Sequence, residues 1–98
     1  MFRITEGRGF QMTFANGWTV SVQFGPYNYC SNRDLNPRSG ESYDRAARDA
    51  GQQGSIDAEI AAWDSNGVWY DFGDDKVKGW VKPDEVADFI EMIRKKDA

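Results

Sequence analysis

Apolar and polar residues alternate in two neighbouring stretches of the chain, residues 10–14 and 18–24. A period of two predicts β-strands with one apolar face. A three-residue loop at 15–17 would place apolar residues of the two strands opposite one another, whereas a two-residue loop would set each apolar residue beside a polar one. We therefore predict a β-hairpin whose three-residue loop is closed by Gly17 in the left-handed conformation.

The same pattern returns in residues 55–72, where the loop 65–67 ends in Gly67 and sets Trp63 opposite Trp69. We predict a second hairpin with two unlike faces. The apolar face, expected to point to the core, carries Ile56, Ala58, Ile60, Ala62, Tyr70 and Phe72. The other face is mixed and carries Asp57, Glu59, Trp63, Trp69 and Asp71.

A further short strand and a helix complete the pattern. Residues 1–5 are either a short strand or a loose lead-in, and alternation over 76–81 predicts a strand with Val77 and Val81 on one side. Pro83 suits the first position of a helix, where its missing N–H leaves no partner unsatisfied. The apolar stripe of that helix is Val86, Phe89, Ile90 and Ile93. The predicted fold is α+β: an antiparallel sheet of two hairpins plus one further strand, packed on one face by a C-terminal helix.

Residues 27–54 differ in character, because they are polar and Leu35 is their only large aliphatic residue. Tyr43 and three alanines recur at helical spacing there, which predicts a short helix over about 42–50. The segment is either a solvated connection or a binding segment, since long connections in a compact domain are often functional. We predict a single domain spanning residues 1–98, with 27–54 as a polar connecting segment.

Composition narrows the class of partner. The formal net charge of −4 at pH 7 disfavours nucleic acid as a direct partner. No apolar run approaches the length of a membrane span, and the first residues lack the apolar core of a signal peptide. Cys30 is the single cysteine, so no internal disulfide can form, which fits a reducing cytoplasm. We therefore expect a cytoplasmic protein without a membrane partner, and we leave open a homodimer.

The residues offer little chemistry. The chain has no histidine, which removes the usual general base and the commonest zinc ligand. Asp71, Asp74 and Asp75 could hold a cation loosely, but a solvated acidic turn is favoured. Cys30 is interpreted as a structural thiol, since no histidine can activate it. We predict no catalytic residue, no cofactor and no metal site, and a hydrolase using acidic residues ranks last for want of a suitable base.

The aromatic residues exceed the needs of a core made by one helix on a sheet. Three interpretations of Trp63 and Trp69 are open. They stabilise the hairpin as a cross-strand pair, they are covered by residues 27–54, or they form an interaction patch. As a patch they would sit in an acidic setting that speeds encounter with a basic surface. The candidate partner-binding residues are Trp63, Trp69, Asp71, Asp57, Glu59, Tyr27, Tyr29, Arg33 and Arg38.

Three longer runs are distinctive: NGWTVSVQFGPYNYC at 16–30, AEIAAWDSNGVWYDF at 58–72 and GWVKPDEVADFIEMI at 79–93. In these runs the chain resembles small accessory proteins of tailed bacteriophages and prophages, of the anti-CRISPR, anti-defence kind. The resemblance implies a non-enzymatic viral protein that binds and inhibits a bacterial target, such as a CRISPR or other defence complex, in the cytoplasm of the host. It brings no catalytic motif with it.

The alternative class is a small-ligand binder that captures an anionic nucleotide. Arginine's planar fork suits a phosphate, and an aromatic ring beside it suits a base. The arginines available for this role are Arg33, Arg38, Arg45 and Arg48.

Overall fold

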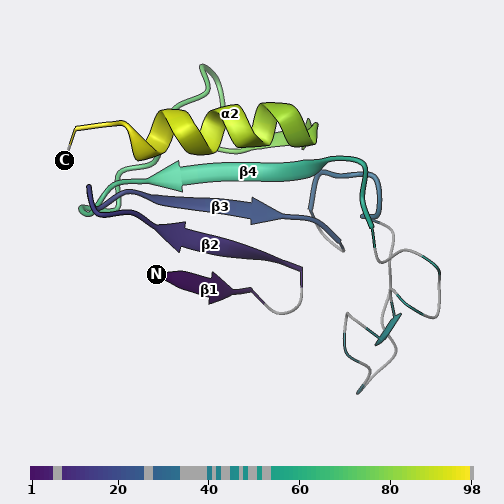
Figure 1. Ribbon diagram of the computed structural model, residues 1–98. Coiled ribbons are helices and arrows are strands. Elements are labelled where there is room, and N and C mark those ends of the chain that lie inside the picture. The colour runs from purple at the N-terminus through teal and green to yellow at the C-terminus, as the bar shows by residue number, and fades with distance from the viewer. Residues whose placement is uncertain are drawn as a thin grey trace.

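A five-stranded antiparallel sheet and one C-terminal helix form the frame of the protein (Figure 1). The computed structural model describes residues 1–5, 8–25, 28–33, 40, 42, 45–46, 48, 51 and 54–97. The strands neighbour one another in chain order: β1 (Phe2–Ile4), β2 (Gly9–Thr13), β3 (Thr19–Gln23), β4 (Ala58–Trp63) and β5 (Lys78–Val81). The helix α2 is Pro83–Arg94. The predicted α+β fold is confirmed.

The first hairpin has the predicted register. Met12 of β2 pairs with Val20 of β3, and Gly17 closes the loop with a φ of 88°. The strand β1 pairs antiparallel with β2, so the first residues of the chain are an edge strand rather than a loose lead-in. An edge of three residues is short, which limits the backbone that it offers to another chain.

The second hairpin begins as predicted. The N–H of Asp64 donates to the carbonyl of Val68 at 2.9 Å, and Gly67 has a φ of 79°. Trp63 pairs with Trp69 across the turn. The three-residue loop is therefore confirmed in both hairpins.

Beyond Tyr70 the prediction for this hairpin is wrong. The register that sets Trp63 opposite Trp69 would also set Ile60 opposite Phe72, but Ile60 pairs with Lys78 of β5. The reason is local: the N–H of Phe72 donates to the carbonyl of Asp75 at 2.9 Å, so the chain turns back on itself instead of following β4. Side chains that bond nearby backbone groups favour turns over strands in this way, and the aspartates here supply them.

The strand β5 contains a register shift. Ala58 of β4 pairs with Val81, and Ile60 pairs with Lys78. Between these two pairs, β5 has one residue more than β4. An extra residue reverses the alternation of side chains. Val81 is consequently in the core, whereas Val77 lines the opposite face. The prediction that they share a side is wrong.

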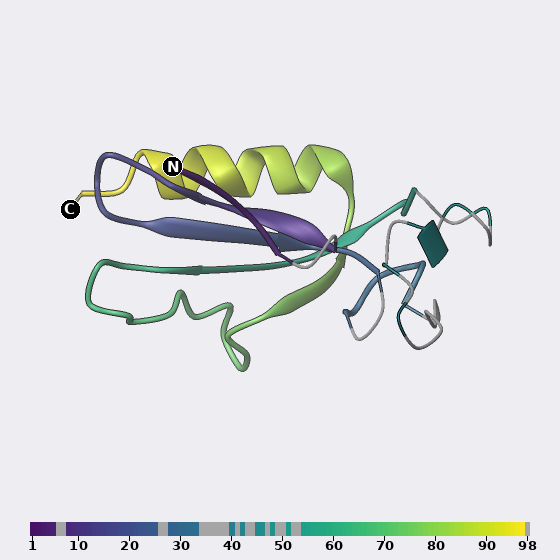
Figure 2. The same cartoon turned by 90° about the horizontal axis from the view of Figure 1, so that it is seen from below.

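The helix α2 runs alongside the sheet and packs on β3 and β4 (Figure 2). Its apolar stripe faces the core as predicted: Phe89 and Ile93 are buried, and Val86 and Ile90 are partly buried against them. The expectation for Ile56 is wrong, because it precedes the first residue of β4 and is 68% exposed.

The loop of the first hairpin is tied to the end of this helix. The side-chain amide of Asn16 donates to the carbonyls of Ile93 (2.9 Å), Arg94 (3.2 Å) and Lys96 (2.9 Å). Carbonyls in the last turn of a helix have no partner within the helix. Asn16 therefore caps α2 from a distant loop and fixes its end over the sheet.

We expect Gly67→Ala to lower the free energy of unfolding by about 1–2 kcal/mol, because a Cβ is strained at positive φ. No atom lies within 4 Å of the added Cβ, so the loss isolates the backbone effect. Gly54 is the matched control, with equally open space and no positive φ. Chemical denaturation should show Gly54→Ala unchanged within about 0.5 kcal/mol, and equal effects at both sites would contradict the loop assignment.

Phe89→Ala should destabilise the protein by about 3–5 kcal/mol, since it empties a core position. The Phe89 ring contacts Tyr70 and Phe72, with ring centroids 5.6 and 5.3 Å away. Met92, on the same helix and 40% exposed, supplies the control, because Met92→Ala should cost less than about 1 kcal/mol. Similar melting temperatures for the two variants would mean that α2 does not dock through this face.

Candidate functional site

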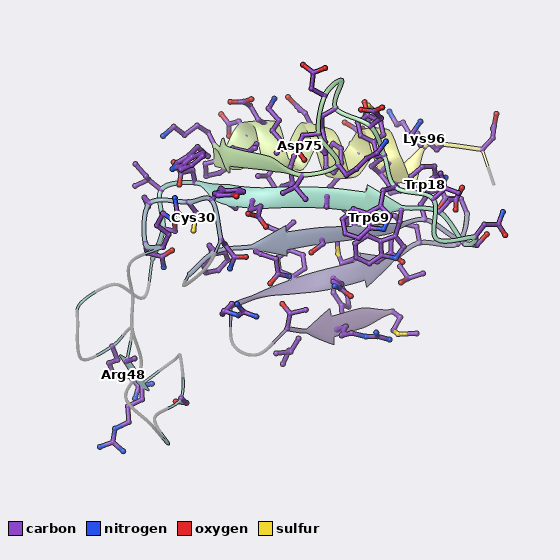
Figure 3. The ribbon with its side chains drawn as sticks, turned by 180° about the vertical axis from the view of Figure 1, so that it is seen from behind. Trp18, Cys30, Arg48, Trp69, Asp75 and Lys96 are labelled. Atoms are coloured by element: carbon purple, nitrogen blue, oxygen red, sulfur yellow. The ribbon has the colours of Figure 1, made fainter. Side chains whose placement is uncertain are left out.

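A pair of tryptophans in tilted ring contact lies on the face of the sheet opposite α2, which we call the open face. Trp63 ends β4, and Trp69 pairs with it as an isolated bridge. Their ring centroids are 4.9 Å apart with an interplanar angle of 33°. Because Ala62 and Tyr70 contribute to the core, alternation sends both tryptophans to the other side, as the sequence predicted. Figure 3 shows the Trp69 side chain lying over the strands.

Trp69 is 43% exposed, whereas Trp63 beneath it is only partly exposed. Tyr29 of the polar segment contacts β4 and β5 near one end of the sheet. The labelled Arg48, farther along the same segment, lies at the opposite end of the molecule from Trp69 (Figure 3). These residues therefore leave the Trp69 ring accessible. The alternative in which segment 27–54 buries both tryptophans does not hold for the part of it that the structure describes.

The tryptophan pair borders a shallow cavity of about 390 Å³ on the open face. Three of its polar side chains bond to one another: Thr5 donates to Gln23 at 2.8 Å, and Gln23 donates to Ser21 at 3.2 Å. The wall is mixed in character, so it can take both apolar and hydrogen-bonding groups. The residues that line it are Ile4, Thr5, Arg8, Gln11, Ser21, Gln23, Glu59, Ala61, Trp63, Trp69 and Val77.

The three acidic candidates are engaged within the chain. Asp57 is buried, where it accepts the N–H of Ser31 at 2.6 Å and pairs with Lys82 at 3.7 Å. Glu59 accepts the N–H of Tyr29 at 2.8 Å. These two carboxylates hold the chain together. Glu59 also lines the cavity beside the tryptophans, as expected, whereas Asp57 lines the cavity on the helix side of the sheet, so its predicted place on the mixed face is wrong.

Asp71 is exposed but also has partners. Its carboxylate accepts the N–H of Gly73 at 2.8 Å and pairs with Lys76 at 3.3 Å. The Gly73 hydrogen bond, followed by the hydrogen bond from Lys76, holds the pKa of Asp71 below its ordinary value. The carboxylate is thus ionised at neutral pH, with its charge directed to the turn.

A second aromatic group, the Tyr29–Trp80 cluster, comprises Tyr29, Trp80 and Arg33. The two rings stack with centroids 5.4 Å apart and an interplanar angle of 27°. The Arg33 guanidinium lies over both rings, 5.2 Å from the Tyr29 centroid and 6.0 Å from that of Trp80. Tyr29 is 46% exposed and Trp80 is 53% exposed. The cluster is therefore an accessible aromatic surface that already attracts a cation.

The backbone of Trp80 is strained. Its φ is 52°, the one positive value for a residue other than glycine in the described part of the chain. The N–H of Trp80 donates to the carbonyl of Tyr29 at 2.8 Å, which holds this conformation. Gly79 beside it admits the close approach of Tyr29, since a Cβ there would collide with that side chain. The sequence analysis named Tyr29 and Arg33 as candidates but did not place Trp80 with them, although a glycine inside a strand pattern signals such a close approach.

The other candidate residues are placed unevenly. Tyr27 and Arg38 lie outside the described residues. Arg45 and Arg48 are helical and exposed. They belong to the stretch 42–50 for which a helix was predicted, and that stretch is only partly covered by the described residues. Of the candidate arginines that the structure describes, Arg33 is the one that we assign to the site, because its guanidinium contacts two aromatic rings.

Other sites were considered across the described residues. Among them, no group of three or more Cys, Asp or Glu side chains could hold a metal ion. Cys30 is buried, with the N–H of Gly25 donating to its sulfur at 3.2 Å. Within the same residues, no helix has the length and apolar character needed to cross a membrane.

A cavity of about 280 Å³ lies between α2 and the sheet. Its wall is largely apolar, and the polar residues on it, Ser55 and Asp57, are hydrogen-bonded to each other or to Ser31. We therefore place the candidate site on the open face and at the Tyr29–Trp80 cluster, where rings are exposed.

We compared the chain with protein-family models, with curated proteins and with solved structures, and none of the three comparisons gave a match.

Strain at Trp80 makes a testable prediction about stability. Trp80→Gly should be more stable than Trp80→Ala by about 1 kcal/mol, because both lose the ring but glycine accepts the positive φ. Lys78 in the same strand is the control, and there alanine should be the more stable replacement by about 0.5–1 kcal/mol. Urea denaturation of the four variants measures their free energies of unfolding. If alanine is more stable than glycine at both positions, the backbone at Trp80 is not strained.

Proposed function

We propose that this chain is a non-enzymatic binding protein whose open face docks on a partner protein, with Trp69 at the centre of the contact. The observation that supports this most is the half-exposed Trp69 ring, held by its stack on Trp63. Tryptophans are enriched among the few residues that supply most binding energy. A ring that is already oriented loses little conformational freedom on binding, so more of its contact energy remains as affinity.

The adjoining cavity favours a protein over a nucleic acid. Its mixed wall accepts an apolar side chain and backbone groups together, as protein interfaces require. A strand of nucleic acid would carry repeated negative charges toward a chain of net charge −4. The partner we expect therefore presents an apolar or aromatic side chain flanked by hydrogen-bonding groups.

The resemblance to phage accessory proteins supports a bacterial defence complex, such as a CRISPR complex, as the partner. A protein of this size would then act by steric occlusion, covering a surface that the complex needs. On this proposal the chain works in the cytoplasm of a bacterial host as an anti-CRISPR-like inhibitor.

Trp69→Ala tests the proposal against a defined target. Bacteria whose CRISPR system targets a given phage would express the wild type, Trp69→Ala or Met92→Ala, and would then be infected with that phage. We expect the wild type and Met92→Ala to restore plaque formation, and Trp69→Ala to lose most of that effect. Binding to the purified complex should weaken about 30-fold, the equivalent of about 2 kcal/mol for a central aromatic residue.

Circular dichroism would establish that Trp69→Ala is folded before the comparison is made. Trp63→Phe is a second variant, since it keeps an aromatic support under Trp69 and should retain binding. A folded Trp69→Ala protein that binds the complex as tightly as the wild type would overturn the assignment of the open face. A wild type that binds no defence complex and leaves plaque formation unchanged would overturn the proposed target.

A further inference from the structure

We propose that the Tyr29–Trp80 cluster is a separate site for a nucleoside monophosphate, whose base stacks on Trp80 while its phosphate is held by Arg33. This site differs from the open face in the residues that would touch the ligand, although Glu59 supports both, since it lines the cavity and holds Tyr29. The chemical class follows from two features found together: an exposed aromatic platform and a guanidinium beside it.

The platform is built and held from below. Trp80 stacks on Tyr29, and a backbone hydrogen bond of 2.8 Å from the Trp80 N–H to the Tyr29 carbonyl fixes the two relative to each other. Tyr29 is itself tied to β4 through its N–H and the carboxylate of Glu59, at 2.8 Å. Exposed rings held in this way suit the stacking of a planar base, since every base has a π-face.

Strain supplies an independent reason. Glycine would relieve the backbone strain at Trp80, and more than half of the tryptophan surface is exposed to solvent. A contribution to the stability of the fold therefore does not account for a tryptophan at this position. Residues held at positive φ against their preference cluster at ligand sites. The strained conformation turns an aromatic ring outward at a point where a relaxed strand would not.

Arg33 gives the site its preference for a phosphate. Its guanidinium now lies over the two rings, where a base would stack. A base that takes this position releases the guanidinium, which then offers its fork of N–H donors to the phosphate attached to that base. Neighbouring lysines have carboxylate partners: Lys78 pairs with Glu85 at 3.9 Å and Lys82 pairs with Asp57 at 3.7 Å. One phosphate therefore suits the local charge better than a polyanionic strand.

The test is a titration of the full chain with the four common nucleoside 5′-monophosphates, followed by the indole N–H signals in two-dimensional NMR. Binding should shift the Trp80 signal with a Kd below about 1 mM. The matching nucleosides, inorganic phosphate and a short single-stranded oligonucleotide are the comparison ligands. Nucleosides should bind at least 10-fold more weakly, phosphate alone should not move the indole signal, and the oligonucleotide should bind no more tightly than the monophosphate.

Variants separate the two parts of the site. Trp80→Gly, which relieves the backbone, should lose binding by 10-fold or more, in line with the value of base stacking on a ring. Arg33→Gln should remove the difference between nucleotide and nucleoside while it leaves weak stacking, and Arg33→Lys should recover only part of that difference. Arg3→Gln, on the distant strand β1, should bind as the wild type does.

Three results would overturn the inference. These are an unmoved Trp80 signal at 10 mM nucleotide, equal affinity for nucleoside and nucleotide, or a preference for the oligonucleotide, which would make the ligand a strand. Trp69→Ala should bind nucleotide normally, and Trp80→Gly should retain its partner protein. The failure of one site therefore leaves a distinct signature from the failure of the other.

Discussion

The outer edge of β4 is the constraint on which both candidate sites depend. A strand edge carries backbone donors and acceptors that need partners when they are buried. No single strand covers this edge: Tyr70 donates to Ala62 near one end, and β5 pairs with Ala58 and Ile60 at the other. The chain must leave β4 after Tyr70, turn, and return as β5. The Trp63–Trp69 pair lies where the first of these two segments pairs with β4, and Trp80 lies in the second segment, within β5.

Division of the edge gives the two sites different physical characters. Trp69 lies where pairing follows the ordinary alternation, so its ring reaches the open face without backbone strain and is supported by Trp63. Trp80 lies in the register shift, where an extra residue and a positive φ turn the ring outward. The first arrangement costs the fold little, whereas the second opposes local preference and is held by Tyr29 and Gly79.

Local pattern predicted what local physics decides. Period-two alternation gave the registers of both hairpin turns, Gly17 and Gly67 signalled their loops, and Pro83 began the helix where it was expected. The features that were missed depend on contacts between distant residues. Asn16 caps a helix that begins more than sixty residues later, and Tyr29 meets Trp80 from a segment of different character. The engagement of Asp57 and Glu59 was missed for the same reason, because their partners Ser31 and Tyr29 are not near them in sequence.

The partners of these two carboxylates bear on how the open face would bind. Asp57 is paired with Lys82 and lies on the helix side of the sheet, so it gives little attraction to a partner on the open face. Glu59 accepts a neutral backbone N–H and keeps its charge beside the cavity, so one carboxylate there can still attract a basic partner. Most of the affinity would come from removing the Trp69 ring and the adjoining cavity wall from water, a contribution that ordinary salt screens little. Shape around one aromatic ring, rather than charge, would therefore decide which partner fits. The same engagement makes Glu59 structural at both sites, since it lines the cavity and holds Tyr29 in place.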